Sequence, residues 1–345
     1  MLSISGILVV MIAVIVWSAL KEFPAAAGLL LPTGAMGRTP FILFSVILGA
    51  GALLIPITAQ LGAGLLPATE IEARQMMLIL MASLLAVLIL DRFALIPSVC
   101  TAFVGALEGY KLVATDDLPL NAAPVLTWVA SLAAVFLLAL LLEYALKALF
   151  VKSGIHIITL SYWMRPVAAA GMCLGIAAIG INNGAVLHAA AGTSGIGVPV
   201  VAAVSAVMTA VLGNALLQRS YAKADLDYEL SLHSAASVSL AVTAVLLCFS
   251  SRQFCGMLHL PASPLGVQAL IAVALLGVSV SRKSFAVEPS AVGKSLAGLI
   301  LSPALALIIV YFSFSLIRRS DNDSYPIVLL LFLLLLLGFL PGQKK

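Results

Sequence analysis

Charged side chains are scarce in this chain. They make up 9% of its 345 residues, whereas hydrophobic residues make up 63%. A soluble domain carries roughly 25% charged residues, and no stretch of soluble-domain composition and appreciable length interrupts the apolar segments. The composition therefore predicts a multi-pass integral membrane protein, which we expect in a bacterial plasma membrane, with the lipid bilayer as its surroundings and no nucleic-acid partner.

Cysteine and histidine are also scarce, with four residues of each. The cysteines form no CxxC pair and all lie in or near apolar segments, where cysteine behaves as a small hydrophobic residue. Their spacing predicts neither a disulfide framework nor a metal site. No HxxxH motif, carboxylate cluster or nucleophile–base spacing is present, so the sequence argues against an integral membrane enzyme.

Apolar segments recur from one end of the chain to the other. A helix needs about 20 apolar residues to cross a bilayer. The segments that approach this length are Leu2–Leu20, Pro40–Leu66, Arg74–Leu90, Ala94–Ala114, Ala123–Phe150, Ile157–Ile181, Val198–Leu217, Leu232–Ser250, Leu258–Val280, Ala291–Ile317 and Pro326–Leu340. We expect an all-α membrane protein with about 9–11 transmembrane helices.

Interruptions by Pro and Gly divide the first 150 residues in a fixed order. A broken stretch begins at Lys21 and ends near Gly37, and a second break follows at Pro97. A long uninterrupted helix from Ala123 completes this first half, residues 1–150. Proline disfavours helical structure both at its own position and at the residue before it, so these positions predict broken or re-entrant helical segments.

The same order returns in the second half, residues 156–318. We expect a broken stretch from Gly180 to near Gly197, a second break at Pro261, and a long helix from Ala291. Corresponding interruptions in two halves are typical of transporters with internal inverted repeats, in which the solute site lies between the repeats near the middle of the bilayer. We interpret residues 325–341 as an extra C-terminal transmembrane helix.

Two adjacent amides, Asn182 and Asn183, lie inside an otherwise apolar segment of the second half. Lipid cannot satisfy their hydrogen-bonding groups, so these groups must face protein, water or a solute. One interpretation is hydrogen bonding between helices. The other is that the amides bind an ion or an oxyanion.

Lys21 and Glu22 occupy the matching place in the first half. They are either an ion pair at the membrane interface or a pair at membrane depth that binds a solute or a coupling ion, since buried charges in membranes are usually functional. Pro24 favours the second interpretation because proline is common in the first turn of a helix. The N-terminus of that new helix would attract an anion.

Hydroxyl groups follow the two proline breaks. Ser98 and Thr101 come after Pro97, and Ser263 comes after Pro261. These hydroxyls could cap the helices that follow, or they could bind an anion together with the free N–H groups of those helices. Thr193 lies in a run of small residues after the two asparagines and joins the candidate site.

One further carboxylate, Glu143, lies four residues before Lys147 on the long helix of the first half. This spacing predicts an ordinary i,i+4 ion pair near a membrane face.

At these positions the chain resembles the inorganic phosphate transporter (PiT) family, which carries one GANDVANA-like motif in each inverted repeat. Residues 180–183 look like GAND, with Asn183 at the aspartate position. Residues 17–28 fit the same frame in the first half, with Lys21 at the asparagine position and Glu22 at the aspartate position.

The family's second element is PVSTTHA followed by VGA. Residues 98–106 match its serine, its alanine and VGA, with Thr101 where the histidine would be, and residues 256–263 look like the GLPVS stretch of the second repeat. The order of these elements carries the resemblance, and no complete motif is present.

The resemblance implies an inverted-repeat fold with two re-entrant regions, often dimeric, that moves a small inorganic oxyanion together with Na+ or H+ and needs no other cofactor. Phosphate is the first expected substrate and sulfate the second. The alternative is a transport-inactive subunit of the same fold that senses an anion or serves a partner. The residues expected to bind substrate are Lys21, Ser98, Thr101, Asn182, Asn183, Thr193 and Ser263, and those expected to couple the ion are Glu22 and Asn183.

Overall fold

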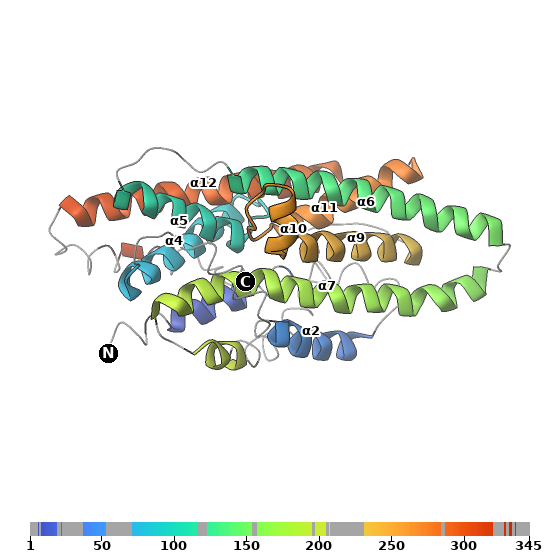
Figure 1. Ribbon diagram of the computed structural model, residues 1–345, viewed down its shortest axis with the longest axis horizontal. Helices are drawn as coiled ribbons and strands as arrows, with labels where there is room; N and C mark the ends of the chain where they lie inside the picture. The colour runs from blue at the N-terminus through green and yellow to red at the C-terminus, as the bar shows by residue number, and fades with distance from the viewer. Residues whose placement is uncertain are drawn as a thin grey trace, which may run out of the picture.

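The computed structural model describes residues 6, 8–18, 22, 37–52, 71–115, 123–153, 157–194, 197–204, 207, 231–283, 287–319, 328, 331, 332 and 335. Within these ranges every regular element is a helix (Figure 1). Lys21, most of the stretch from Lys21 to Gly37, and most of the last predicted span, Pro326–Leu340, lie outside the described residues.

Five of the described helices are long and apolar enough to cross a membrane. They are α4 (Ala73–Arg92), α6 (Ala123–Ser153), α7 (Ile157–Ser194), α9 (Leu232–Ser250) and α12 (Pro289–Arg319). Shorter helices are the segment Leu8–Ser18, α2 (Arg38–Ala52), α5 (Val99–Thr115), α10 (Arg252–Met257) and α11 (Val267–Arg282). The protein is thus an all-α, multi-pass integral membrane protein.

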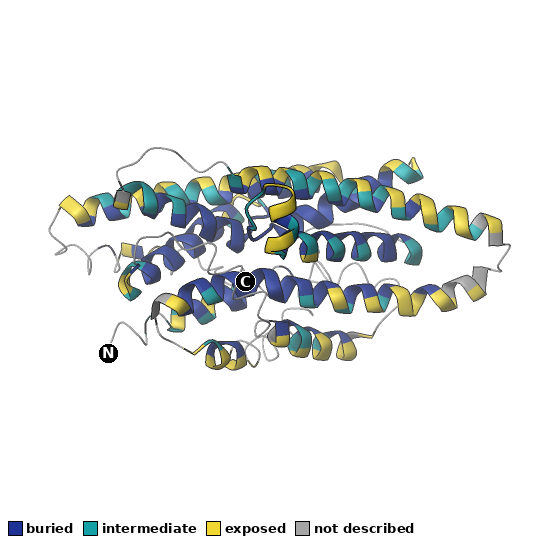
Figure 2. Ribbon diagram, viewed as in Figure 1, coloured by how far each residue is buried: buried dark blue, intermediate teal, exposed yellow. Residues whose placement is uncertain are grey.

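Helices α6 and α12 expose much of their surface, whereas α4 is mostly buried (Figure 2). Leu141 on α6 is 62% exposed, and Ile300 and Phe312 on α12 are each 67% exposed. Large apolar side chains on the outside of a bundle fit a lipid environment, because hydrocarbon does not penalise their exposure. The outer surfaces of α6 and α12 therefore face lipid.

The two proline breaks predicted from the sequence are present. Helix α4 ends at Arg92 and α5 begins at Val99, with Pro97 in the non-helical segment between them. In the second half, residues 258–266 are non-helical before α11 begins. Proline explains both breaks, because it lacks the N–H that a helix interior needs and restrains the residue before it.

The half-helices α5 and α11 begin close together in the middle of the bundle and run toward its opposite ends (Figure 1). A Cβ added to Gly266, which precedes α11, would lie 3.7 Å from Cβ of Ser98, which precedes α5. The N-terminal ends of two helices that are far apart in sequence therefore meet at the centre of the molecule.

Each half-helix packs against the long helix of the other half: α5 against α12, and α11 against α6. Glycines permit this close approach, since a Cβ on Gly109 would lie 2.5 Å from the Leu307 carbonyl oxygen and one on Gly277 would lie 2.5 Å from that of Phe136. A twofold internal repeat would produce this crossed packing. The division into repeats at 1–150 and 156–318 stays a prediction.

The break predicted at Gly180–Asn183 is wrong, because α7 continues through these residues as one helix to Ser194. Two features stabilise it there. Gly180 lies against the backbone of α2, where an added Cβ would lie 2.6 Å from the Gly49 carbonyl oxygen. The amide groups of Asn182 and Asn183 find partners on neighbouring segments, so their polarity does not require the helix to open.

Candidate functional site

Asn183 lies at the centre of a buried hydrogen-bond network. Its side-chain Nδ2 donates to Oε2 of Glu22 at 2.8 Å, and its Oδ1 accepts from Ser18 Oγ at 3.0 Å and from Cys100 Sγ at 2.9 Å. Glu22 is 3% exposed and Asn183 is 5% exposed. This network joins α7 to the end of the first helix and to the start of α5.

Asn182 forms hydrogen bonds to the non-helical segment at the second break. Its Nδ2 donates to the carbonyl oxygen of Leu265 at 2.9 Å, and its Oδ1 accepts from the N–H of Leu265 at 2.7 Å. Non-helical backbone at membrane depth is stable only where protein or water satisfies its polar groups. A fully buried amide on α7 therefore holds the peptide just before α11 in place.

The breaks are also tied to the long helices. The N–H of Ser98 donates to Oγ of Ser302 on α12 at 3.3 Å, and Trp128 on α6 donates its indole N–H to the carbonyl oxygen of Pro264 at 3.0 Å. These bonds cross between the halves in the same sense as the helix packing. They fix where α5 and α11 begin.

Two buried hydroxyls at these helix starts have no hydrogen-bond partner within the described part of the chain. They belong to Ser98, which is 8% exposed, and Ser263, which is 2% exposed. Neither hydroxyl acts as a helix cap, and the residue that caps α11 is Gly266. Because buried polar groups are rarely left unpaired, these two hydroxyls are available to hydrogen-bond to a solute or water.

The starts of α5 and α11 add donors to this region. The first N–H groups of a helix have no partner within the helix, and the aligned peptide dipoles favour negative charge there. Together with the hydroxyls of Ser98 and Ser263, two helix N-termini that face each other form a setting suited to an anion.

The remaining predicted site residues differ in position. The hydroxyl of Thr101 donates to the carbonyl oxygen of Ser98, three residues earlier, at 3.2 Å. Thr193 lies about three helical turns beyond Asn183 on α7, so the structure does not bring these two residues together. Lys21 lies outside the described residues. Across the described ranges, no group of three His, Cys, Asp or Glu residues is placed to hold a metal ion.

Sequence reasoning missed two members of the network, Ser18 and Cys100. Ser18 lies four residues before Glu22, a spacing that places two side chains on one helix face. Cys100 lies between Ser98 and Thr101, the two residues chosen as candidates, and was interpreted as a buried hydrophobic residue. Its contact with Asn183 joins residues 83 positions apart, which no local pattern indicates.

We expect Asn182→Ala to destabilise the protein markedly. The substitution leaves the N–H and the carbonyl of Leu265 buried without partners, at a cost of about 1–3 kcal/mol for each group. The melting temperature of purified protein in detergent measures the effect. Ser83→Ala is the matched control, because among the described residues the Ser83 hydroxyl bonds only to the Ile79 carbonyl of its own helix. Equal melting temperatures for the two variants would contradict this role of Asn182.

Long apolar helices around two facing half-helices define a helical membrane transporter fold. The chain is similar to a solved structure described as "The sodium-dependent phosphate transporter", with a TM-score of 0.67 and 15% sequence identity over 92% of this chain and 100% of that one. At this identity the similarity establishes the fold. No protein-family model and no curated protein sequence matches the chain.

Proposed function

We propose that this protein is a secondary transporter for inorganic phosphate, which moves the anion by alternating access together with a cation. The observation that carries the proposal is the pair of buried, unpartnered hydroxyls of Ser98 and Ser263 at the facing starts of α5 and α11. The likeness in fold to a phosphate transporter supports it.

The donors and acceptors around the helix starts favour phosphate over sulfate. The hydroxyls and helix N–H groups donate to oxyanion oxygens, whereas the Glu22 carboxylate is an acceptor and repels a fully deprotonated anion. Phosphate keeps at least one O–H near neutral pH and can donate it to such an acceptor, but sulfate has none. A site that contains a hydrogen-bonding group strongly rejects an analogue without the matching partner.

We propose a proton as the coupling ion. Glu22 is the single carboxylate in the described part of the network, and its neighbour across the site, Asn183, is neutral. A buried carboxylate away from water is strongly stabilised by binding a cation or a proton. One carboxylate is enough to bind a proton, whereas a sodium site would need several well-placed oxygen ligands.

The substrate is tested with purified protein in liposomes, by measuring uptake of labelled phosphate and of labelled sulfate. Uptake is measured under an inwardly directed proton gradient and, separately, under an inwardly directed Na+ gradient. We expect phosphate uptake under the pH gradient and sulfate uptake at least about tenfold slower. Equal rates for the two anions would overturn the assignment of phosphate.

A second candidate function is an anion-sensing or partner subunit that has lost transport. The neutral Asn183, at a position where the resembled family carries an acid, favours it. Equilibrium binding separates the two functions: a sensor binds phosphate tightly and shows no uptake in liposomes under any ion gradient.

A further inference from the structure

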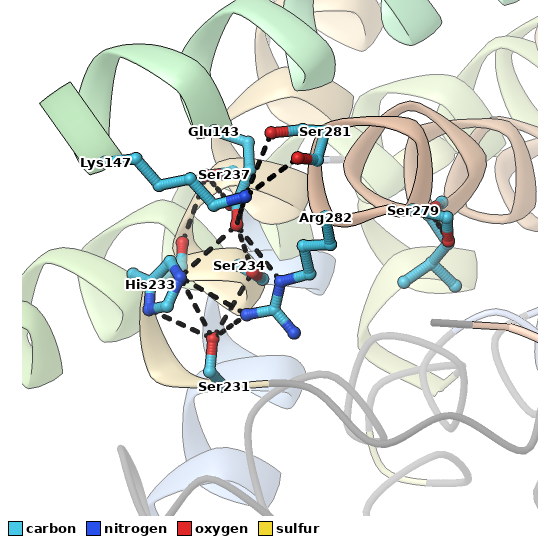
Figure 3. Close-up of polar contacts among 10 residues, drawn as sticks. Glu143, Lys147, Ser231, His233, Ser234, Ser237, Ser279, Ser281 and Arg282 are labelled. Atoms are coloured by element: carbon cyan, nitrogen blue, oxygen red, sulfur yellow. Dashed lines mark hydrogen bonds and ion pairs between the residues drawn. The ribbon is translucent and has the colours of Figure 1, made fainter. Parts of the chain in front are cut away.

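A second buried carboxylate lies away from the central site, on α6. Glu143 is completely buried, and its Oε1 accepts from Ser234 Oγ at 2.7 Å and from Arg282 Nε at 3.2 Å (Figure 3). Its Oε2 accepts from Ser237 Oγ at 2.9 Å. Lys147, the partner predicted from the sequence, lies at 3.9 Å and is the most distant of these contacts. The i,i+4 pair is therefore a minor part of a larger network.

The network connects three helices. Lys147 on α6 donates to the carbonyl oxygen and the hydroxyl of Ser281 on α11, each at 3.1 Å. Arg282, the last residue of α11, donates to Ser231 at the start of α9 and lies 3.3 Å from His233. We call these eight residues the Glu143 network: Glu143, Lys147, Ser231, His233, Ser234, Ser237, Ser281 and Arg282. It fixes the C-terminal end of α11 to both neighbours.

Helix α11 links this network to the central site. Its 16 residues extend over about 24 Å. Arg282 belongs to the network at one end, and Leu265, just before the other end, holds both hydrogen bonds to Asn182. A movement of α11 away from α6 and α9 would therefore act on the peptide that Asn182 binds.

Different contacts hold the half-helix α5 at the opposite end of the bundle. Helix α5 is held there by the hydroxyl of Tyr110, which donates to Oε1 of Gln75 on α4 at 2.9 Å, and by the ring of Tyr110, which meets Phe314 on α12 edge to face at 5.1 Å. A cation also takes part, because Arg318 on α12 donates to the carbonyl oxygen of Val113 on α5 at 2.9 Å. The two half-helices run to opposite ends of the bundle, so each end has its own set of contacts.

We propose that the Glu143 network is an ionic latch that closes the central site toward the membrane face at which α11 ends. While the latch is intact, α11 stays docked on α6 and α9, and Leu265 stays on Asn182. Opening toward this face requires the latch to separate, so Glu143 and Arg282 act as positioning residues for the site. The proposal rests on the proposed alternating-access transport.

Cys100 provides a reporter in the protein itself, because its thiol is buried at the central site and bonded to Asn183. In a background with Cys173, Cys248 and Cys255 replaced by alanine, a membrane-impermeant thiol reagent is applied to each side of proteoliposomes in turn. A separate Lys152→Cys variant, at an exposed position near the end of α6, identifies the face at which α11 ends. The readout is the rate of Cys100 labelling, which is measured without phosphate. A failure of the latch proposal is therefore distinguishable from a failure of the proposed phosphate transport.

We expect Glu143→Gln to raise the labelling rate of Cys100 from the α11 face about tenfold, because the charge that holds Arg282 is lost. Ser237→Ala should raise it by a smaller factor and provides the test should Glu143→Gln fail to fold. Tyr110→Phe, at the opposite end of the bundle, should raise labelling from the opposite face only. An unchanged rate from the α11 face in the folded variants, or an equal rise from both faces, overturns the latch.

Discussion

Glu22→Gln is expected to abolish uphill accumulation of phosphate, reducing it to the level of protein-free liposomes, while exchange of phosphate across the membrane persists. Glutamine has nearly the same volume and still offers an oxygen to the Asn183 amide, which donates to Glu22 at 2.8 Å. It cannot bind and release a proton. Accumulation under a pH gradient and exchange at equal phosphate concentrations, measured on the same preparation, separate the loss of coupling from the loss of binding.

Glu288→Gln is the matched control for this substitution. Glu288 is an exposed carboxylate just before α12 and is remote in sequence from Glu22 and Asn183. Phosphate accumulation by this variant should therefore equal that of the wild type. If Glu22→Gln still accumulates phosphate as the wild type does, Glu22 is not the coupling group.

Gly298→Ala is expected to lower both the melting temperature and the rate of phosphate uptake. An added Cβ would collide with the Ile96 carbonyl oxygen and would lie 3.0 Å from the Pro97 nitrogen. Backbone cannot move aside as a flexible side chain can, and overpacking of this kind costs about 1–3 kcal/mol. The first break would be pushed from α12, together with the Ser98 hydroxyl that we assign to the anion.

Gly293→Ala on the same helix is the control, because a Cβ there meets no heavy atom within 4 Å. Alanine is the better helix former by about 1 kcal/mol, so this variant should melt at or above the wild-type temperature. Thermal melting in detergent and uptake in liposomes measure both variants. Similar behaviour of the two would mean that contact between α12 and the first break is not required.

The sequence predicted those parts of the fold that depend on local chemistry. Pro97 and Pro261 lack the N–H that a helix interior needs, and the breaks before α5 and α11 are present. The break expected at Asn182 and Asn183 is absent because partners elsewhere in the fold satisfy the amides. Asparagine is a weak helix former rather than a helix breaker, so tertiary contacts decide its structure.

In the candidate site too, local patterns in the sequence were informative, whereas contacts between distant residues were not predictable. The correspondence between the two halves pointed to Glu22 and Asn183, and the structure brings their side chains into contact. The Glu143 network was not predictable, because the residues that hold Glu143 lie 91 and 139 positions away for Ser234 and Arg282. Local spacing indicated only Lys147.

Uptake of labelled phosphate into liposomes that contain the wild-type protein, with an inward pH gradient as the sole driving force, tests the central claim most directly. The account predicts accumulation above the external concentration that protein-free liposomes do not show and that collapses when a protonophore removes the gradient. Absence of phosphate movement under this gradient and under a Na+ gradient, from protein that is folded and correctly inserted, would contradict the account.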